Sequence, residues 1–323
     1  MLGSLRSFIK MVPTLKLNNN VDFPVLGLGS SQAKNGEMEK AVKEAIDIGY
    51  RHFDTAFIYG NEHEIGAAVR AKIEEGVVKR EDIFITNKLW ITFLRPDLVI
   101  PACRRSLQAM GLEYMDMYLV HFPISLKDGD DLWPRDENGK FIPSESDYVE
   151  TWKQMEECVR LGLTKSIGIS NFNTEQIERL LANATIKPVV NQVECHPYFN
   201  QSKLKAFCKQ RDIVITAYAP FGRPGSKAPT MKQGVLSLLE DPVLLEMATK
   251  YNKTIAQIIL RYLVQHGVVP IPKSSNPNRM KENIDIFDFQ LESEDVAVLA
   301  ALRSWNRLNI LMDVKNYPFN IEF

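Results

Sequence analysis

The sequence predicts an α/β fold, a (β/α)8 TIM barrel with an N-terminal β-hairpin, extra helices and a C-terminal loop. Three observations predict it. Eight short apolar segments alternate with segments of helical period, no linker divides the 323 residues, and polar residues end seven consecutive predicted strands. We therefore expect a single barrel domain over residues 1–323, in which residues 1–11 are an extension.

The elements follow in order along the chain. Alternating apolar residues at 14–17 and 21–23 flank three asparagines and predict the hairpin. The strands are predicted at 25–28, 51–53, 83–86, 117–120, 165–169, 189–193, 213–217 and 268–271. Helices are predicted at 37–48, 62–75, 97–110, 148–161, 174–181, 202–210, 242–251, 255–264, 277–284 and 292–302. Asn61, with Glu64 three residues later, is expected to cap the second helix, and Asn173 or Thr174 the fifth.

The alternative α/β fold is a doubly wound sheet that binds a dinucleotide. It requires a G-x-G-x-x-G motif after the first strand, because the third glycine lets the helix pack closely on the sheet. Gly27 and Gly29 are present, but Gln32 stands at the third position. The fingerprint fails, which favours the barrel.

The bulk composition excludes several classes of protein. A net charge of −1, with no basic run longer than two residues, argues against a general nucleic-acid binder. No apolar run reaches the length needed to span a membrane. The four cysteines form no CxxC pair, which indicates reduced thiols in a cytoplasmic protein. Cys195-His196 lacks a second pair at zinc spacing, so no metal site is expected.

The first 21 residues contain no acidic residue. A transit peptide also lacks acids, but this segment has no apolar centre typical of a secretory signal. An extension without function, with Met11 as another start, is the favoured interpretation.

Polar groups gather at the predicted strand ends. They are Asp54, Lys88, His121, Ser170-Asn171, Gln192, Tyr218 and Lys273. Singly, a lysine fits the surface, a histidine the core and an asparagine a helix cap. Because the carboxyl ends of barrel strands face one site, a run of seven favours a polar pocket.

The residue types in this set suit carbonyl reduction. Asp54 keeps Lys88 charged, and a charged lysine is expected to lower the pKa of Tyr59 below about 10. Such a tyrosine can protonate a developing alkoxide, while His121 orients the carbonyl oxygen. No side chain supplies a hydride, so a cofactor must.

Further residues suit a nucleotide cofactor. Tyr218 can stack on a flat ring, and Ser170, Asn171 and Gln192 can hydrogen-bond a carboxamide. A segment rich in donors precedes the helix that begins at Pro277, and such a helix N-terminus binds anions. The donors are Lys273, Ser274, Asn276 and Arg279. An ordinary helix cap with surface charges is the alternative interpretation.

From about Leu15 to Phe323 the chain closely resembles the aldo-keto reductase superfamily, of the aldose and aldehyde reductase type. The matching segments are 27–29, 49–56, 59–62, 88–90, 118–123, 167–172, 191–194, 271–274 and 317–319. The resemblance implies NADPH-dependent reduction of aldehydes and ketones without a metal, in a cytoplasmic monomer. Insect members are also similar, and for them 3-dehydroecdysteroids are a candidate substrate class.

The family's catalytic tetrad falls on Asp54, Tyr59, Lys88 and His121, with Tyr59 as the general acid. The resemblance also implies a cofactor site. Its residues are Ser170, Asn171, Gln192, Tyr218 and Phe221 around the nicotinamide half, Lys273, Ser274, Asn276 and Arg279 near the 2′-phosphate, and Glu282 and Asn283 near the adenine. A Lys–Arg pair on the 2′-phosphate is the reason to expect NADPH rather than NADH.

The chain departs from the family around the substrate. Ser30-Ser31 stands where many relatives have Trp, Phe122 replaces another Trp, and Ala219 replaces a serine. A smaller side chain after Gly29 is expected to admit bulky, steroid-like ketones. The predicted substrate contacts, each of which alone also fits a core position, are Phe57, Trp90, Phe122, Trp133, Trp305 and Leu308.

Two other classes of function compete. The family includes binding and structural proteins that keep the fold, and some keep the tetrad as well. A Schiff-base lyase with Lys88 as nucleophile is the second alternative. Pairing with Asp54 should keep Lys88 protonated, which makes it a poor amine nucleophile.

Overall fold

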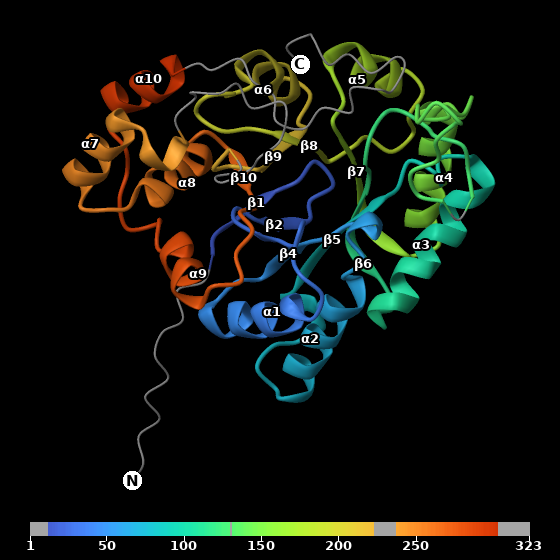
Figure 1. The fold of residues 1–323 in the computed structure, drawn as a ribbon, viewed down its shortest axis with the longest axis horizontal. Coiled ribbons are helices and arrows are strands. Elements are labelled where there is room, and N and C mark those ends of the chain that lie inside the picture. Colours follow the sequence, from blue (N-terminus) through green and yellow to red (C-terminus); the bar gives the residue numbers. More distant parts are fainter. Residues whose placement is uncertain (1–11, 130, 223–236, 303–323) are drawn as a thin grey trace.

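The computed structural model describes residues 12–129, 131–222 and 237–302. The predicted extension 1–11 and the predicted substrate contacts Trp305 and Leu308 lie outside these residues. Helices form a ring around the central strands (Figure 1).

Eight parallel strands form the central sheet and follow one another in chain order. They are β3 (Leu28–Gly29), β4 (His52–Asp54), β5 (Phe84–Leu89), β6 (Met115–Val120), β7 (Thr164–Ser170), β8 (Val190–Glu194), β9 (Val214–Tyr218) and β10 (Val268–Pro270). The first and last strands meet, because Gly29 pairs with Lys273 and the Gly27 amide donates to the Pro270 carbonyl at 3.0 Å. The predicted (β/α)8 barrel is confirmed.

Each described helix begins and ends at or next to the predicted residue. The helices are α1 (Glu37–Ile48), α2 (Glu62–Glu74), α3 (Pro96–Met110), α4 (Tyr148–Arg160), α5 (Thr174–Leu181), α6 (Ser202–Lys209), α7 (Pro242–Tyr251), α8 (Ile255–Gln265), α9 (Pro277–Ile284) and α10 (Ser293–Ala301). Short 3₁₀ turns add η1 (Phe57–Tyr59), η2 (Arg80–Asp82) and η3 (Leu238–Glu240).

One predicted cap is confirmed and another is wrong. Asn173 caps α5 by accepting from the Gln176 amide at 2.8 Å. Asn61 makes no such bond to α2, because its buried side chain instead accepts from the Thr55 hydroxyl at 2.9 Å. The Glu64 carboxylate likewise turns away from α2 and accepts from amides at the start of α1. Both side chains therefore join different elements.

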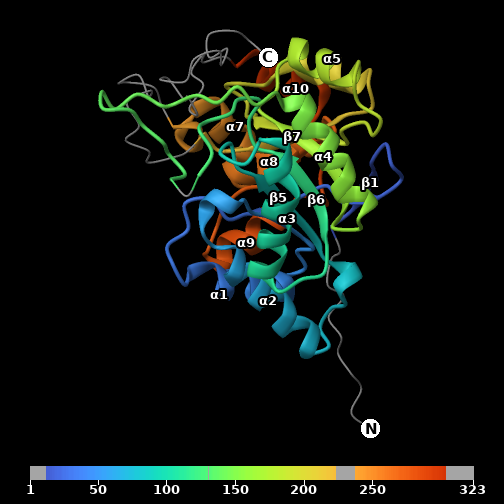
Figure 2. The same ribbon diagram turned by 90° about the vertical axis from the view of Figure 1, so that its right-hand side faces the viewer.

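The hairpin closes one end of the barrel. Strands β1 (Thr14–Lys16) and β2 (Asp22–Pro24) pair antiparallel, and Phe23 is fully buried against Phe84, with ring centroids 4.9 Å apart. We call this the amino end, because the barrel strands start there. The loop between β6 and α4 extends from the opposite, carboxyl end (Figure 2).

Two further properties concern the described residues. No helix among them is both long and apolar enough to cross a bilayer. The four cysteines are buried and unpaired, and burial raises the pKa of the Cys195 thiol to about 11. Their thiols are therefore protonated at neutral pH.

Candidate active site

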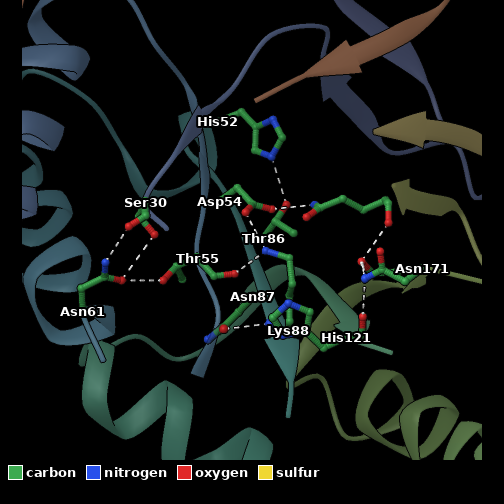
Figure 3. A network of polar contacts seen from close by, with 12 residues as sticks. Ser30, His52, Asp54, Thr55, Asn61, Thr86, Asn87, Lys88, His121 and Asn171 are labelled. Carbon is green, nitrogen blue, oxygen red and sulfur yellow. Dashed lines mark hydrogen bonds and ion pairs between the residues drawn. The ribbon is translucent and has the colours of Figure 1, made fainter. Parts of the chain in front are cut away.

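A buried ion pair lies at the carboxyl end of β4 and β5. Lys88 Nζ donates to Asp54 Oδ1 at 2.6 Å and to the Thr55 carbonyl at 2.8 Å. The second Asp54 oxygen accepts from Gln192 Nε2 at 2.8 Å. The Lys88 side chain is 0% exposed and that of Asp54 is 3% exposed. Three strands therefore hold one satisfied pair of charges (Figure 3).

The sheet register explains how these groups meet. Asp54 lies opposite Thr86 in the parallel ladder. Side chains alternate along a strand, so Lys88, two residues farther, faces the same interior. Burial raises the pKa of Asp54, while Lys88 and Gln192 oppose that rise by favouring the carboxylate. The charge of the pair thus depends on its hydrogen bonds.

Tyr59 ends the η1 turn next to this pair. Lys88 Nζ lies 5.2 Å from its ring centroid. Burial raises the pKa of Tyr59, and the opposing effects of Lys88 and a hydrogen-bonding contact from Ser31 do not reverse this. The expected lowering of the tyrosine pKa is therefore wrong. Loss of hydration costs the phenolate more than one nearby cation returns. A tyrosine of this kind keeps its proton at neutral pH and can donate it.

His121 follows β6 and faces the tyrosine. The two rings are 5.9 Å apart and nearly perpendicular, and Phe122 stacks on the imidazole at 5.0 Å. Burial, together with the charge of Lys88, lowers the pKa of His121 well below its usual value. Its ring is neutral and makes no hydrogen bond with any described side chain or backbone group, and its Nδ1 is buried. A neutral imidazole in this position can hydrogen-bond a bound carbonyl group.

The predicted carboxamide ligands form one connected network. The Ser170 hydroxyl donates to the Gln192 carbonyl at 2.8 Å, and the Tyr218 hydroxyl donates to Asn171 Oδ1 at 2.8 Å. Asn171 Nδ2 donates in turn to the His121 carbonyl at 2.9 Å. Asn171 has φ of 64°, in the left-handed region that non-glycine residues seldom adopt. Such strained positions cluster at functional sites because the surroundings impose them.

The α9 N-terminus carries the predicted anion ligands. Asn276 caps the helix by accepting from the amides of Asn278 and Arg279. The Arg279 guanidinium forms no ion pair with any described residue, whereas Lys273 Nζ lies 3.4 Å from the Glu37 carboxylate. A carboxylate already sits on this donor set, so the set suits an anionic group such as a phosphate.

The predicted adenine contacts lie along the same helix. The Glu282 carboxylate accepts from the Thr254 hydroxyl at 2.8 Å. Asn283 is 3% exposed, so its side chain is almost wholly covered by the protein. Glu282 is thus already engaged by the start of α8.

The predicted substrate contacts do not all lie together. Trp90 is close to the rings of His121, Phe122 and Trp133, at 5.3, 6.2 and 4.8 Å. Trp133 is 41% exposed, so this aromatic group reaches solvent. The Phe57 ring instead contacts Phe93 at 5.1 Å and the guanidinium of Arg105 at 4.8 Å. The predicted cofactor contact Phe221 is partly buried and packs against the main core.

Three contributors to the site were not expected from the sequence. Thr55 acts through its carbonyl, and backbone groups leave no signature in a sequence. Ser31 was noted as a departure from the family, yet its contact with Tyr59 depends on how the loop folds. Glu37 reaches Lys273 across 236 residues of sequence. No local pattern predicts such a pair.

Comparisons with known proteins agree with this geometry. The sequence profile of the Aldo/keto reductase family matches residues 25–304. The chain is 50% identical over 316 residues to aldo-keto reductase family 1 member C23-like protein of Equus caballus, covering 95% of this chain and 98% of that protein. It is 48% identical over 317 residues to dihydrodiol dehydrogenase 3 of Bos taurus, covering 96% and 98%. The aldose reductase structure from Schistosoma japonicum is similar with a TM-score of 0.89 at 42% identity, covering 96% and 99%. The chain therefore belongs to the aldo/keto reductase family.

Proposed function

We propose that this protein reduces aldehydes and ketones to alcohols with NADPH, and that Tyr59 donates the proton. Membership of the family supports carbonyl reduction as the general chemistry. The observation that carries the specific proposal is the fully buried Lys88 ammonium, held by Asp54 and Thr55 and 5.2 Å from the Tyr59 ring. It is a fixed cation beside the group that would become a phenolate.

Each residue of the proposed tetrad has a defined task. NADPH, when bound, supplies the hydride that the carbonyl carbon accepts. Tyr59 gives its phenolic proton to the carbonyl oxygen, and the resulting phenolate is stabilised by Lys88. Asp54 and the Thr55 carbonyl hold Lys88 in place. Neutral His121 donates a hydrogen bond that orients the carbonyl group.

The cofactor contacts are proposed in three groups. Tyr218 and Phe221 lie against the nicotinamide half, and Ser170, Asn171 and Gln192 bind its carboxamide. Because Gln192 Nε2 is engaged by Asp54, this residue would contribute its Oε1 atom. The 2′-phosphate is assigned to Lys273, Ser274, Asn276 and Arg279, and the adenine to Glu282 and Asn283. The unpaired Arg279 guanidinium among the described residues supports an anion at this helix start.

The proposed substrate is a bulky carbonyl compound, with steroid-like ketones and 3-dehydroecdysteroids as the candidates to test. Small side chains at Ser30 and Ser31, where many relatives carry Trp, support this. The substrate contacts are proposed to be Phe57, Trp90, Phe122, Trp133, Trp305 and Leu308. We also propose that the chain works as one barrel domain, as a cytoplasmic monomer and without a metal.

The surroundings of Lys88 weigh against the lyase alternative. A Schiff base requires a neutral, accessible amine. The Lys88 side chain is 0% exposed, and its ammonium already donates to two oxygen atoms. Forming an imine would break both bonds and leave the buried Asp54 carboxylate without its cation.

The test is NADPH oxidation followed by absorbance with a panel of aldehydes, ketones and a steroid ketone. The Tyr59→Phe variant is expected to lose about 10²–10⁴-fold in kcat, because it lacks the general acid, and to bind NADPH as the wild type does. Tyr114→Phe is the matched control, since that ring lies between Arg80 and Lys165 away from the tetrad. NADPH binding without turnover of any substrate by the wild type contradicts the enzyme and favours a binding module.

A further inference from the structure

The first residue of α1 reaches the anion ligands of α9. Glu37 Oε1 accepts a hydrogen bond from the Ser275 hydroxyl, and Glu37 Oε2 lies 3.4 Å from Lys273 Nζ. The same Oε2 accepts from the Lys34 amide at 3.0 Å. The Glu37 and Lys273 side chains are 31% and 33% exposed. A carboxylate is thus inserted among the donors that we assign to the 2′-phosphate.

The start of α1 is held firmly in this position. The Glu64 carboxylate accepts from the Gly36 amide at 2.9 Å and from the Met38 amide at 2.8 Å, on either side of Glu37. The Tyr50 hydroxyl, just after the helix, donates to the Met280 carbonyl in α9 at 3.0 Å. The Ser275 hydrogen bond is the main reason that the pKa of Glu37 is lowered. Glu37 is therefore charged at neutral pH and tied to α9.

We infer that Glu37 is a specificity-determining residue that reduces the preference of this protein for 2′-phosphorylated dinucleotides. The inference rests on the proposed cofactor site. A 2′-phosphate carries about −1.5 to −2 charges, so it must displace the Glu37 carboxylate from Lys273 or bind beside it. An unphosphorylated ribose meets no such repulsion, and a carboxylate can accept from its 2′-hydroxyl.

The size of the effect follows from the exposure of the pair. Repulsion between like charges at a partly exposed site changes affinity about three- to tenfold. Arg279 is free of this competition within the described part of the chain, so it keeps some preference for the phosphate. Lys273 is expected to contribute less than its charge alone would give.

The test is calorimetric titration of the full chain with NADP⁺ and with NAD⁺. Glu37→Gln is expected to tighten NADP⁺ about three- to tenfold and to leave NAD⁺ unchanged or weaker. Glu39→Gln is the matched control, because it removes the same charge from the same helix but its carboxylate pairs with Lys43 at 2.6 Å. It should change neither affinity.

A second set of variants tests the pairing itself. Lys273→Met should weaken NADP⁺ more in the Glu37→Gln protein than in the wild type, because Lys273 is then no longer shared. If Glu37→Gln weakens NADP⁺, or shifts both nucleotides equally, Glu37 only positions the loop and the inference is overturned. If the wild type binds neither nucleotide, the proposed cofactor fails as well. Binding of NADP⁺ with unchanged discrimination overturns the inference alone.

Discussion

The two ends of the barrel hold buried histidines that differ in their hydrogen bonding. At the amino end, His52 is fully buried, its Nε2 lies 3.0 Å from the Thr86 hydroxyl, and the Phe23 and Phe84 rings are 4.9 and 5.4 Å away. At the carboxyl end, His121 is 7% exposed and makes no side-chain hydrogen bond with a described residue. Figure 3 shows both residues in one network.

The difference separates stability from chemistry. The amino end is filled so closely that a Cβ added to Gly27 would lie 2.5 Å from His52 Nδ1. That end gains stability from packing and a satisfied hydroxyl. The carboxyl end leaves polar groups unpaired inside the protein, which costs stability unless a ligand satisfies them. Changes at the two ends should therefore affect different measurements.

The largest effect is expected where the carboxyl end does contain a complete pair. Lys88→Met leaves Asp54 charged and buried, which should cost about 3–5 kcal/mol of unfolding free energy and abolish turnover. The Asp54→Asn, Lys88→Met double variant removes both charges and should recover much of that stability but no activity. Urea unfolding and NADPH oxidation measure the two effects. Equal stability of the single variant and the wild type would contradict a buried charged pair.

The amino end should control the response to acid. Burial lowers the pKa of His52 to about 3 from 6.5, so below pH 6.5 the unfolded chain binds a proton that the folded chain refuses. This contribution to stability is complete above pH 6.5 and is lost as the pH falls toward 3. It amounts to about 2 kcal/mol between pH 7 and pH 5.

His52→Gln keeps a group that can bond Thr86 but cannot titrate. Its unfolding free energy, measured by urea denaturation, should fall by about 2 kcal/mol less than that of the wild type over the same pH interval. Activity at pH 7 should change little, because His52 lies at the end away from the tetrad. An identical pH dependence in both proteins would show that His52 titrates normally.

The smallest effect concerns Ser31, beside Tyr59. Its contact favours the phenolate, so Ser31→Ala should raise the pKa of Tyr59 further. Alcohol oxidation with NADP⁺ requires the phenolate, and its rate near neutral pH should fall about three- to tenfold, while carbonyl reduction changes less. Rates in both directions across a pH series measure this. Ser30→Ala is the control, since Ser30 donates to Asn61 instead, at 3.3 Å.

Much of the fold and the identity of the site residues were predictable. Hydrophobic period, glycines and prolines are local signals, and they gave helix bounds such as Glu37–Ile48 correctly. Parallel strands align their carboxyl ends, so residues that end strands were expected to meet, and Asp54, Lys88 and Gln192 do meet. Their pairwise bonds were less predictable, as Gln192 contacts Asp54 in addition to any ligand role.

The sequence by itself thus determined the order of elements and the residues that gather at the carboxyl end of the barrel. Only the tertiary structure decided their states and partners. The pKa of Tyr59 is raised because burial outweighs Lys88, and Glu37 contacts Lys273 because α1 packs against α9. Both depend on desolvation and on contacts between distant segments, which exist only once the chain has folded.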